Sequence, residues 1–225
     1  RTFCLGSLAS INLSKYKIAS SAYRRLRRDI NHAQKKHIHI IEKKEPLSTA
    51  EIKAIMCLSE LFLKGKKEYK ILFSTIAYIN NGERRLFLAY SADNKIVGIL
   101  LCRPSYQNNK IVSYYADILR RNKNFSTRGI NEALFDQACK TFQKEGVKNL
   151  NLSWAMKFVT TKYDNLLSHI LLKTCLLFFS FIYPYHRYLE NQLKYNPEYS
   201  PLYFCSRNVF PVRLGLKLMK FIGVI

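Results

Sequence analysis

Residues 111–154 read IVSYYADILRRNKNFSTRGINEALFDQACKTFQKEGVKNLNLSW, and this stretch decides the fold class. Ile111 to Ala116 is an apolar run rich in β-branched and aromatic residues, which is typical of a strand. After a polar loop that contains one glycine, apolar residues recur at helical spacing from Ile130 to Phe142. A further strand is predicted at Lys148 to Trp154. The stretch therefore predicts a strand, a loop, a helix and a strand in succession.

Two further apolar runs come before this stretch, at residues 86–90 and 96–101. They flank the turn sequence Ser91–Lys95, which predicts a β-hairpin. Ser48 and Glu51 form a capping-box pattern, which predicts the start of a helix that continues to about Leu63. The whole order indicates an α/β (α+β) domain with a mixed central sheet flanked by helices.

The order of hairpin, strand, glycine-containing loop, helix and strand resembles the core of the GNAT (acyl-CoA N-acyltransferase) fold. In that fold one strand splays from its neighbour, and the start of a helix faces the substrate in the gap. A helix start presents unpaired N–H groups, which suit a phosphate or an oxyanion. The resemblance therefore implies a GNAT-like fold that supports acyl transfer.

The chain carries a large excess of positive charge. Its 225 residues include 37 Lys and Arg against 15 Asp and Glu, which gives a formal net charge of +22. Hydrophobic residues make up 48% of the chain, enough for a packed core, and this excludes a disordered polycation. A surface of this charge favours phosphate-bearing partners, either nucleic acid or anionic lipid.

A basic helix is predicted after Ser20 and Ser21. Apolar residues from Tyr23 to Ala33 fall on one face, and the remaining surface is almost purely cationic. Mixed charge is usual on a solvated helix face, so we expect this face to contact phosphate, with a merely solvated face as the alternative. Its arginines are Arg24, Arg25, Arg27 and Arg28.

The six cysteines are scattered, and the five histidines form no triad with a serine and an acid. We therefore expect free thiols, no metal site and no nucleophilic catalysis. The apolar segment Leu166–Tyr183 is interrupted by His169 and Lys173, which favours a buried or membrane-surface helix over a spanning one. Residues 212–225 form an amphipathic basic pattern that can lie in a membrane interface or cap the core.

Six short motifs follow one another along the chain: LRRDINHA (26–33), Glu68 with Phe73-Ser74, Asp117-Ile-Leu-Arg120, GINEALF (129–135), Asn151-Leu152 and KYNPEY (194–199). Each is weak alone, but their order resembles one family, the C-terminal catalytic domain of phosphatidylglycerol lysyltransferase and its relatives. The similarity extends over nearly the whole chain.

This resemblance implies an enzyme that moves an amino acid, of lysine or alanine type, from aminoacyl-tRNA to a hydroxyl of a membrane lipid. The lipid that the resemblance implies is phosphatidylglycerol. The expected partners are aminoacyl-tRNA and an anionic membrane on the cytoplasmic side of a bacterial cell, with no cofactor. The family domain resembles two GNAT-like halves in tandem. Residues 1–19 would then be the remnant strand and linker of the first half, and residues 20–225 the catalytic second half with a C-terminal amphipathic helix.

The same resemblance assigns roles to individual residues. Asp117 would orient or deprotonate the acceptor hydroxyl, and Arg120 would clamp a phosphate, whereas the alternative is an Asp–Arg surface pair of little consequence. Glu68 and Glu132 are further catalytic candidates, and for Glu132 the alternative is that it merely complements the helix dipole. The tRNA contact falls to the arginines of the basic helix. Lipid or phosphate binding is expected of Gly129, Arg187, Lys194 and Tyr195.

Two other functions stay open at this point. An acyl-CoA-dependent GNAT N-acyltransferase would use successive N–H groups of a glycine-rich loop to cradle pyrophosphate, whereas residues 124–131 (NFSTRGIN) offer a single glycine. A non-enzymatic basic module that binds RNA or an anionic membrane would need only the surface charge.

Overall fold

The computed structural model describes residues 2–63, 83–155 and 190–205. The chain divides into two compact units, one of residues 12–150 and one of residues 1–11 with 151–225. The described elements are, in chain order, β1 (Thr2–Asn12), the 3-10 turns η1 (Leu13–Lys15) and η2 (Ser21–Tyr23), α1 (Arg24–Lys35), β2 (His39–Lys43), α2 (Thr49–Leu63), β3 (Arg85–Tyr90), β4 (Ile96–Gln107), β5 (Lys110–Arg121), α3 (Ile130–Lys144), β6 (Asn149–Ala155) and β7 (Glu198–Cys205).

The unit of residues 12–150 is built on four antiparallel strands in the order β2-β3-β4-β5. The predicted hairpin, third strand and following helix are all present, and the third strand continues to Arg121, beyond the predicted Ala116. The sequence order expected for a GNAT-like core, strand, strand, strand, helix and strand, is therefore found from β3 to β6. The α/β fold class is confirmed.

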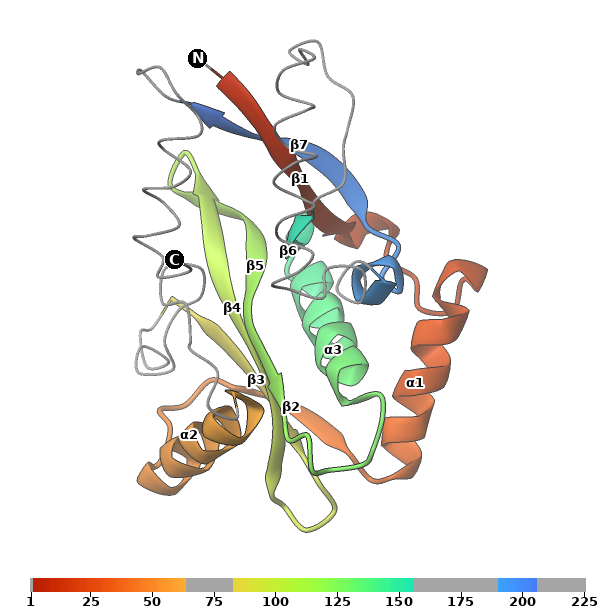
Figure 1. The fold of residues 1–225 in the computed structure, drawn as a ribbon, viewed down its shortest axis with the longest axis vertical. Helices are drawn as coiled ribbons and strands as arrows, with labels where there is room; N and C mark the ends of the chain where they lie inside the picture. Colours follow the sequence, from red (N-terminus) through yellow and green to blue (C-terminus); the bar gives the residue numbers. More distant parts are fainter. Residues whose placement is uncertain (1, 64–82, 156–189, 206–225) are drawn as a thin grey trace. The chain divides into compact units, whose positions relative to one another are not determined.

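Helix α2 covers one face of these strands (Figure 1). Its start is the predicted capping box: the Glu51 N–H donates to Ser48 Oγ at 3.2 Å, and the Ser48 N–H donates to Glu51 Oε2 at 2.8 Å. Ile55 and Leu58 are buried against the sheet, where each contributes about 1.5–3 kcal/mol of transfer free energy. Their partners on the strands are Leu86, Leu88, Ile99, Leu101 and Ile118.

Helix α3 packs on the other face. The Phe142 ring lies edge-on to Phe87, with centroids 5.7 Å apart, and stacks on Tyr114 at 4.1 Å. The helix approaches β4 closely at Gly98, where an added Cβ would lie 2.7 Å from a methyl carbon of Ile130. A glycine at this position therefore lets α3 lie directly on the strand.

The second unit contains β1, β6 and β7. β1 pairs with β7 in antiparallel register from Thr2 opposite Cys205 to Ser10 opposite Glu198. The register shifts between Cys4 and Gly6, and Gly6 has a φ of +121°, which a glycine adopts without steric cost. The proposed boundary between residues 19 and 20 stays a prediction.

Candidate active site

Strand β5 contains a bulge at Asp117, the residue proposed from the sequence as the catalytic acid. Leu101 of β4 lies opposite Ile118, whereas the next residue, Cys102, lies opposite Ala116. Asp117 is therefore the extra residue of β5, which the register between the two strands skips. Bulges of this kind re-aim a side chain and are frequent next to active sites.

The bulge brings Asp117 and Arg120 to the same face of the sheet. In a regular strand, residues three apart point to opposite faces. Arg120 lies opposite Ile99, a member of the apolar cluster beneath α2, and so faces the α2 side. The Asp117 carboxylate contacts Arg103, which shares the α2 side with Leu101 because the two are two residues apart on β4.

Asp117 and Arg120 are both buried. The Asp117 side chain is 0% exposed, and Arg120 as a residue is 5% exposed. This burial excludes the alternative of an Asp–Arg pair on the surface. A charged group in such a position needs a partner of opposite charge, since desolvation of an unpaired carboxylate is very costly.

Arg103, which no motif of the sequence indicates, supplies that opposite charge. Its Nε lies 3.1 Å from Asp117 Oδ2, and its guanidinium carbon lies 5.8 Å from the centre of the Tyr115 ring. The Arg103 side chain is 43% exposed. It therefore connects a fully buried carboxylate to the solvent-facing part of the sheet. No local sequence pattern predicts this contact, because it depends on the register of β4 against β5.

The start of α3 is fixed by Gly129. This residue caps the helix with a φ of +90°, and an added Cβ would lie 1.9 Å from the backbone oxygen of Asp29 in α1. The glycine is thus needed for α1 and α3 to pack together at this point, and its predicted phosphate contact stays a prediction. Glu132 lies in the first turn of α3 and is 9% exposed, where a carboxylate complements the helix dipole.

The predicted basic helix is present as α1, and its four arginines do not all face solvent. Arg24, Arg25 and Arg28 are exposed. Arg27 is half-buried and donates from Nη1 to the backbone oxygens of Ile18, at 2.6 Å, and Ser20, at 3.1 Å. Arg27 therefore fastens the segment that leads into the helix, and the exposed cationic face is made by the other three.

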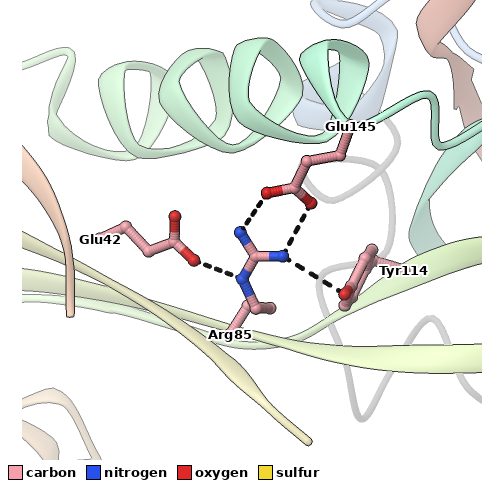
Figure 2. Close-up of polar contacts among 4 residues, drawn as sticks. All are labelled: Glu42, Arg85, Tyr114 and Glu145. Carbon is pink, nitrogen blue, oxygen red and sulfur yellow. Dashed lines mark hydrogen bonds and ion pairs between the residues drawn. The ribbon is translucent and has the colours of Figure 1, made fainter. Parts of the chain in front are cut away.

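A cluster of polar side chains around Arg85 lies beneath the C-terminal end of α3 (Figure 2). Arg85 of β3 donates from Nε to Glu42 and, from its two Nη atoms, to Glu145 at 2.8 and 2.7 Å. Its Nη1 also lies 3.4 Å from the Tyr114 hydroxyl, and its guanidinium carbon lies 5.2 Å from the Phe142 ring centre. No pattern in the sequence indicates this cluster, because its members are far apart in the chain.

These contacts act on both charges. The hydrogen bonds that Arg85 donates to Glu145 and Glu42 raise the pKa of Arg85, although burial opposes this. The hydrogen bond from Arg85 lowers the pKa of Glu145. The cluster ties β2, β3, β5 and α3 together and leaves no group directed at a reacting atom, so we assign it to the scaffold.

Several predicted site residues fall elsewhere. Glu68 and Arg187 lie outside the described residues, as do the segments 166–183 and 212–225. The helical residues 190–193 of the second unit are followed by Lys194 and Tyr195. Tyr195 is 6% exposed, and its backbone N–H donates to the Gln192 backbone oxygen at 3.0 Å. Lys194 is half-buried. None of the helices in the part of the chain that the structure describes is long and apolar enough to cross a bilayer.

Comparison with known proteins agrees with this fold. Residues 1–206 match the family model described as phosphatidylglycerol lysyltransferase, C-terminal. The structure of L-PGS from Bacillus licheniformis has a TM-score of 0.73 at 20% identity; the match covers 99% of this chain and 67% of that one. The C-terminal domain of a candidate lysylphosphatidylglycerol synthetase from Agrobacterium fabrum has a TM-score of 0.69 at 15% identity, covering 100% of this chain and 66% of that one.

At these identities the two structures establish the fold, and the chain spans about two thirds of their length. A search of the curated proteins finds no match. The family model covers far more than half of the chain, and it agrees with the motifs from which the family was first inferred. The chain therefore belongs to the family of phosphatidylglycerol lysyltransferase C-terminal domains.

Proposed function

We propose that this chain transfers an amino acid, of lysine or alanine type, from aminoacyl-tRNA to a hydroxyl of a membrane lipid. The lipid that we propose as the acceptor is phosphatidylglycerol. The family to which it belongs supports aminoacyl transfer to lipid as the general activity. The observation that carries the proposal in this chain is the bulge that directs the buried Asp117 carboxylate to the same face as Arg103 and Arg120.

The reaction is acyl transfer between two oxygens. The acceptor hydroxyl attacks the carbonyl carbon of the donor ester, a new C–O bond forms, and the C–O bond to the ribose breaks. Asp117 receives the hydroxyl proton and returns it to the departing ribose oxygen, so the protons balance. General acid–base assistance of this kind contributes typically 10²–10⁴-fold. Because the donor is already an ester, no covalent enzyme intermediate is needed, and alignment of the two substrates supplies much of the rest.

The donor would be held by the cationic face of α1. Arg24, Arg25 and Arg28 are exposed on this helix, and so are Lys35 and Lys36 at its end. Arg128, on the loop before α3, adds a side chain that is 58% exposed. A group of exposed, positively charged side chains on one surface binds the phosphate backbone of an RNA, and the binding affinity falls as the salt concentration rises.

The acceptor places the enzyme at a membrane. A lipid headgroup stays at the surface of its bilayer, so the Asp117 face must approach that surface. We propose the cytoplasmic side, because aminoacyl-tRNA is present there. The net charge of +22 favours an anionic leaflet. The segments 166–183 and 212–225 remain the candidates for direct contact with lipid.

The proposal is tested by expressing the full-length protein in bacteria and analysing the extracted lipids by mass spectrometry. We expect an aminoacylated phosphatidylglycerol, identified by its added mass, that is absent when Asp117 is replaced by Asn. Asp93→Asn is the matched control, since Asp93 is exposed in the turn between β3 and β4. Lipids that are unchanged by the wild-type protein, or a product that survives Asp117→Asn, would contradict the proposal.

A further inference from the structure

We propose that Arg103 binds the phosphate of the lipid headgroup, next to the carboxylate that receives the acceptor hydroxyl. This inference rests on the proposed function and adds a binding residue to it. Arg103 lies in the middle of β4, at a position opposite Tyr115 of β5. Neither the motifs of the sequence nor the residue roles expected from them include it.

Asp117 engages one edge of the Arg103 guanidinium, while the side chain as a whole is still 43% exposed. Nε is buried and lies 3.1 Å from Asp117 Oδ2, while the Tyr115 ring supports the guanidinium plane at 5.8 Å. Since Nε is inaccessible, the 43% exposure of the side chain belongs to its other atoms. The proposed contact uses the two Nη groups, because paired N–H donors in a plane match two oxygens of a phosphate.

The neighbouring arginine is less suited to this task. Arg120 is 5% exposed and lies opposite Ile99, above the apolar cluster of α2. A phosphate that arrives from solvent therefore meets Arg103 first. The sequence prediction gave the phosphate clamp to Arg120; the structure favours Arg103 for contact with the ligand and Arg120 for the buried side of the same face.

The spacing of the two charges favours a lipid over an RNA phosphate. In phosphatidylglycerol, the acceptor hydroxyls and the phosphate belong to one glycerol unit, so they are only a few bonds apart. A guanidinium and a carboxylate in direct contact can bind both at once. In aminoacyl-tRNA the ester oxygen and the 5′ phosphate of the same nucleotide are held on opposite faces of a ribose ring, which restricts their approach, whereas the open glycerol chain can fold to bring a hydroxyl and the phosphate together.

The test is calorimetric binding of two probes to the full chain: dihexanoyl-phosphatidylglycerol below its micelle concentration, and the trinucleotide CCA. For Arg103→Gln we expect the lipid affinity to fall about ten- to hundredfold, as for loss of a charge-assisted hydrogen-bond pair, with CCA binding unchanged. Arg103→Lys keeps the charge without the fork and should lie between Gln and wild type. Lys95→Gln, an exposed turn residue, is the control and should bind both probes normally.

Asp117→Asn separates this inference from the proposed function. The variant should abolish turnover, while the lipid affinity stays within about threefold because Asn retains an amide oxygen for the lipid hydroxyl and Arg103 retains the phosphate contact. Survival of turnover would refute the role of Asp117 and leave the binding result to decide on Arg103.

The double variant Arg103→Gln/Asp117→Asn carries no buried carboxylate at position 117 and should bind lipid as poorly as Arg103→Gln alone. Restored affinity in the double variant would mean that Arg103 only neutralises Asp117, which overturns the inference. Wild-type lipid affinity in Arg103→Gln, or a loss confined to CCA, would overturn it as well.

Discussion

Replacement of Arg85 by Met should destabilise the unit of residues 12–150 by about 3–4 kcal/mol. Breaking a buried ion pair by removing one partner costs about 3–5 kcal/mol, because a charge is left buried. Here that charge is Glu42, whose side chain is 10% exposed. Glu145 is 41% exposed and can be rehydrated, so its loss adds at most about 1 kcal/mol. Met retains part of the packing against Phe142, which lowers the total slightly (Figure 2).

The measurement is urea-induced unfolding followed by far-UV circular dichroism, with the slope m compared between variants. Glu145→Gln is the matched control and should cost less than about 1 kcal/mol. The double variant Arg85→Met/Glu42→Leu should recover at least half of the loss, since a buried pair replaced by apolar residues is often neutral. A change below about 1 kcal/mol for Arg85→Met at unchanged m would refute this account of the cluster.

Three further perturbations test other parts of the account. Gly129→Ala should destabilise by about 2–5 kcal/mol, through a φ of +90° and the overlap with the Asp29 backbone oxygen, and thermal melting with no shift would contradict this. The hydrogen bond from Lys43 lowers the pKa of Glu51 from 4.5 to about 2. The ionised Glu51 therefore stabilises the fold fully above about pH 4.5, and this contribution is lost as the pH falls toward 2. Glu51→Gln should reduce the pH dependence of the free energy of unfolding across that window, and an unchanged dependence would contradict this. Replacement of the three exposed arginines Arg24, Arg25 and Arg28 by Glu should weaken tRNA binding. The slope of log K against log salt, measured by fluorescence anisotropy, should become shallower by about two to three. An unchanged slope would show that this face does not contact the tRNA.

The local elements of the fold could be predicted from the sequence, because their signals are local. The capping box at Ser48 and Glu51 and the turn at Ser91–Lys95 each involve residues within a few positions of one another, and both are confirmed. Burial of Ile130, Leu134, Ala138 and Phe142 follows the helical period read from the sequence.

The candidate site could be predicted only in part. Asp117 and Arg120 were found through a motif, but their common face depends on a bulge that arises from the register of β4 against β5. Arg103 contacts Asp117 for the same reason, and nothing in its own neighbourhood marks it. The Arg85 cluster likewise joins groups from β2, β3, β5 and α3, and such contacts are set by tertiary structure.

The central claim is that Asp117 promotes aminoacyl transfer to a lipid hydroxyl. The most direct test incubates the purified full-length protein with phosphatidylglycerol vesicles and tRNA charged with labelled lysine or alanine, and measures label in the extracted lipid over time. We expect transfer by the wild type and by Asp93→Asn, and a rate at least about 100-fold lower for Asp117→Asn. Label that stays on the tRNA with both amino acids, or transfer by Asp117→Asn at the wild-type rate, would contradict the claim.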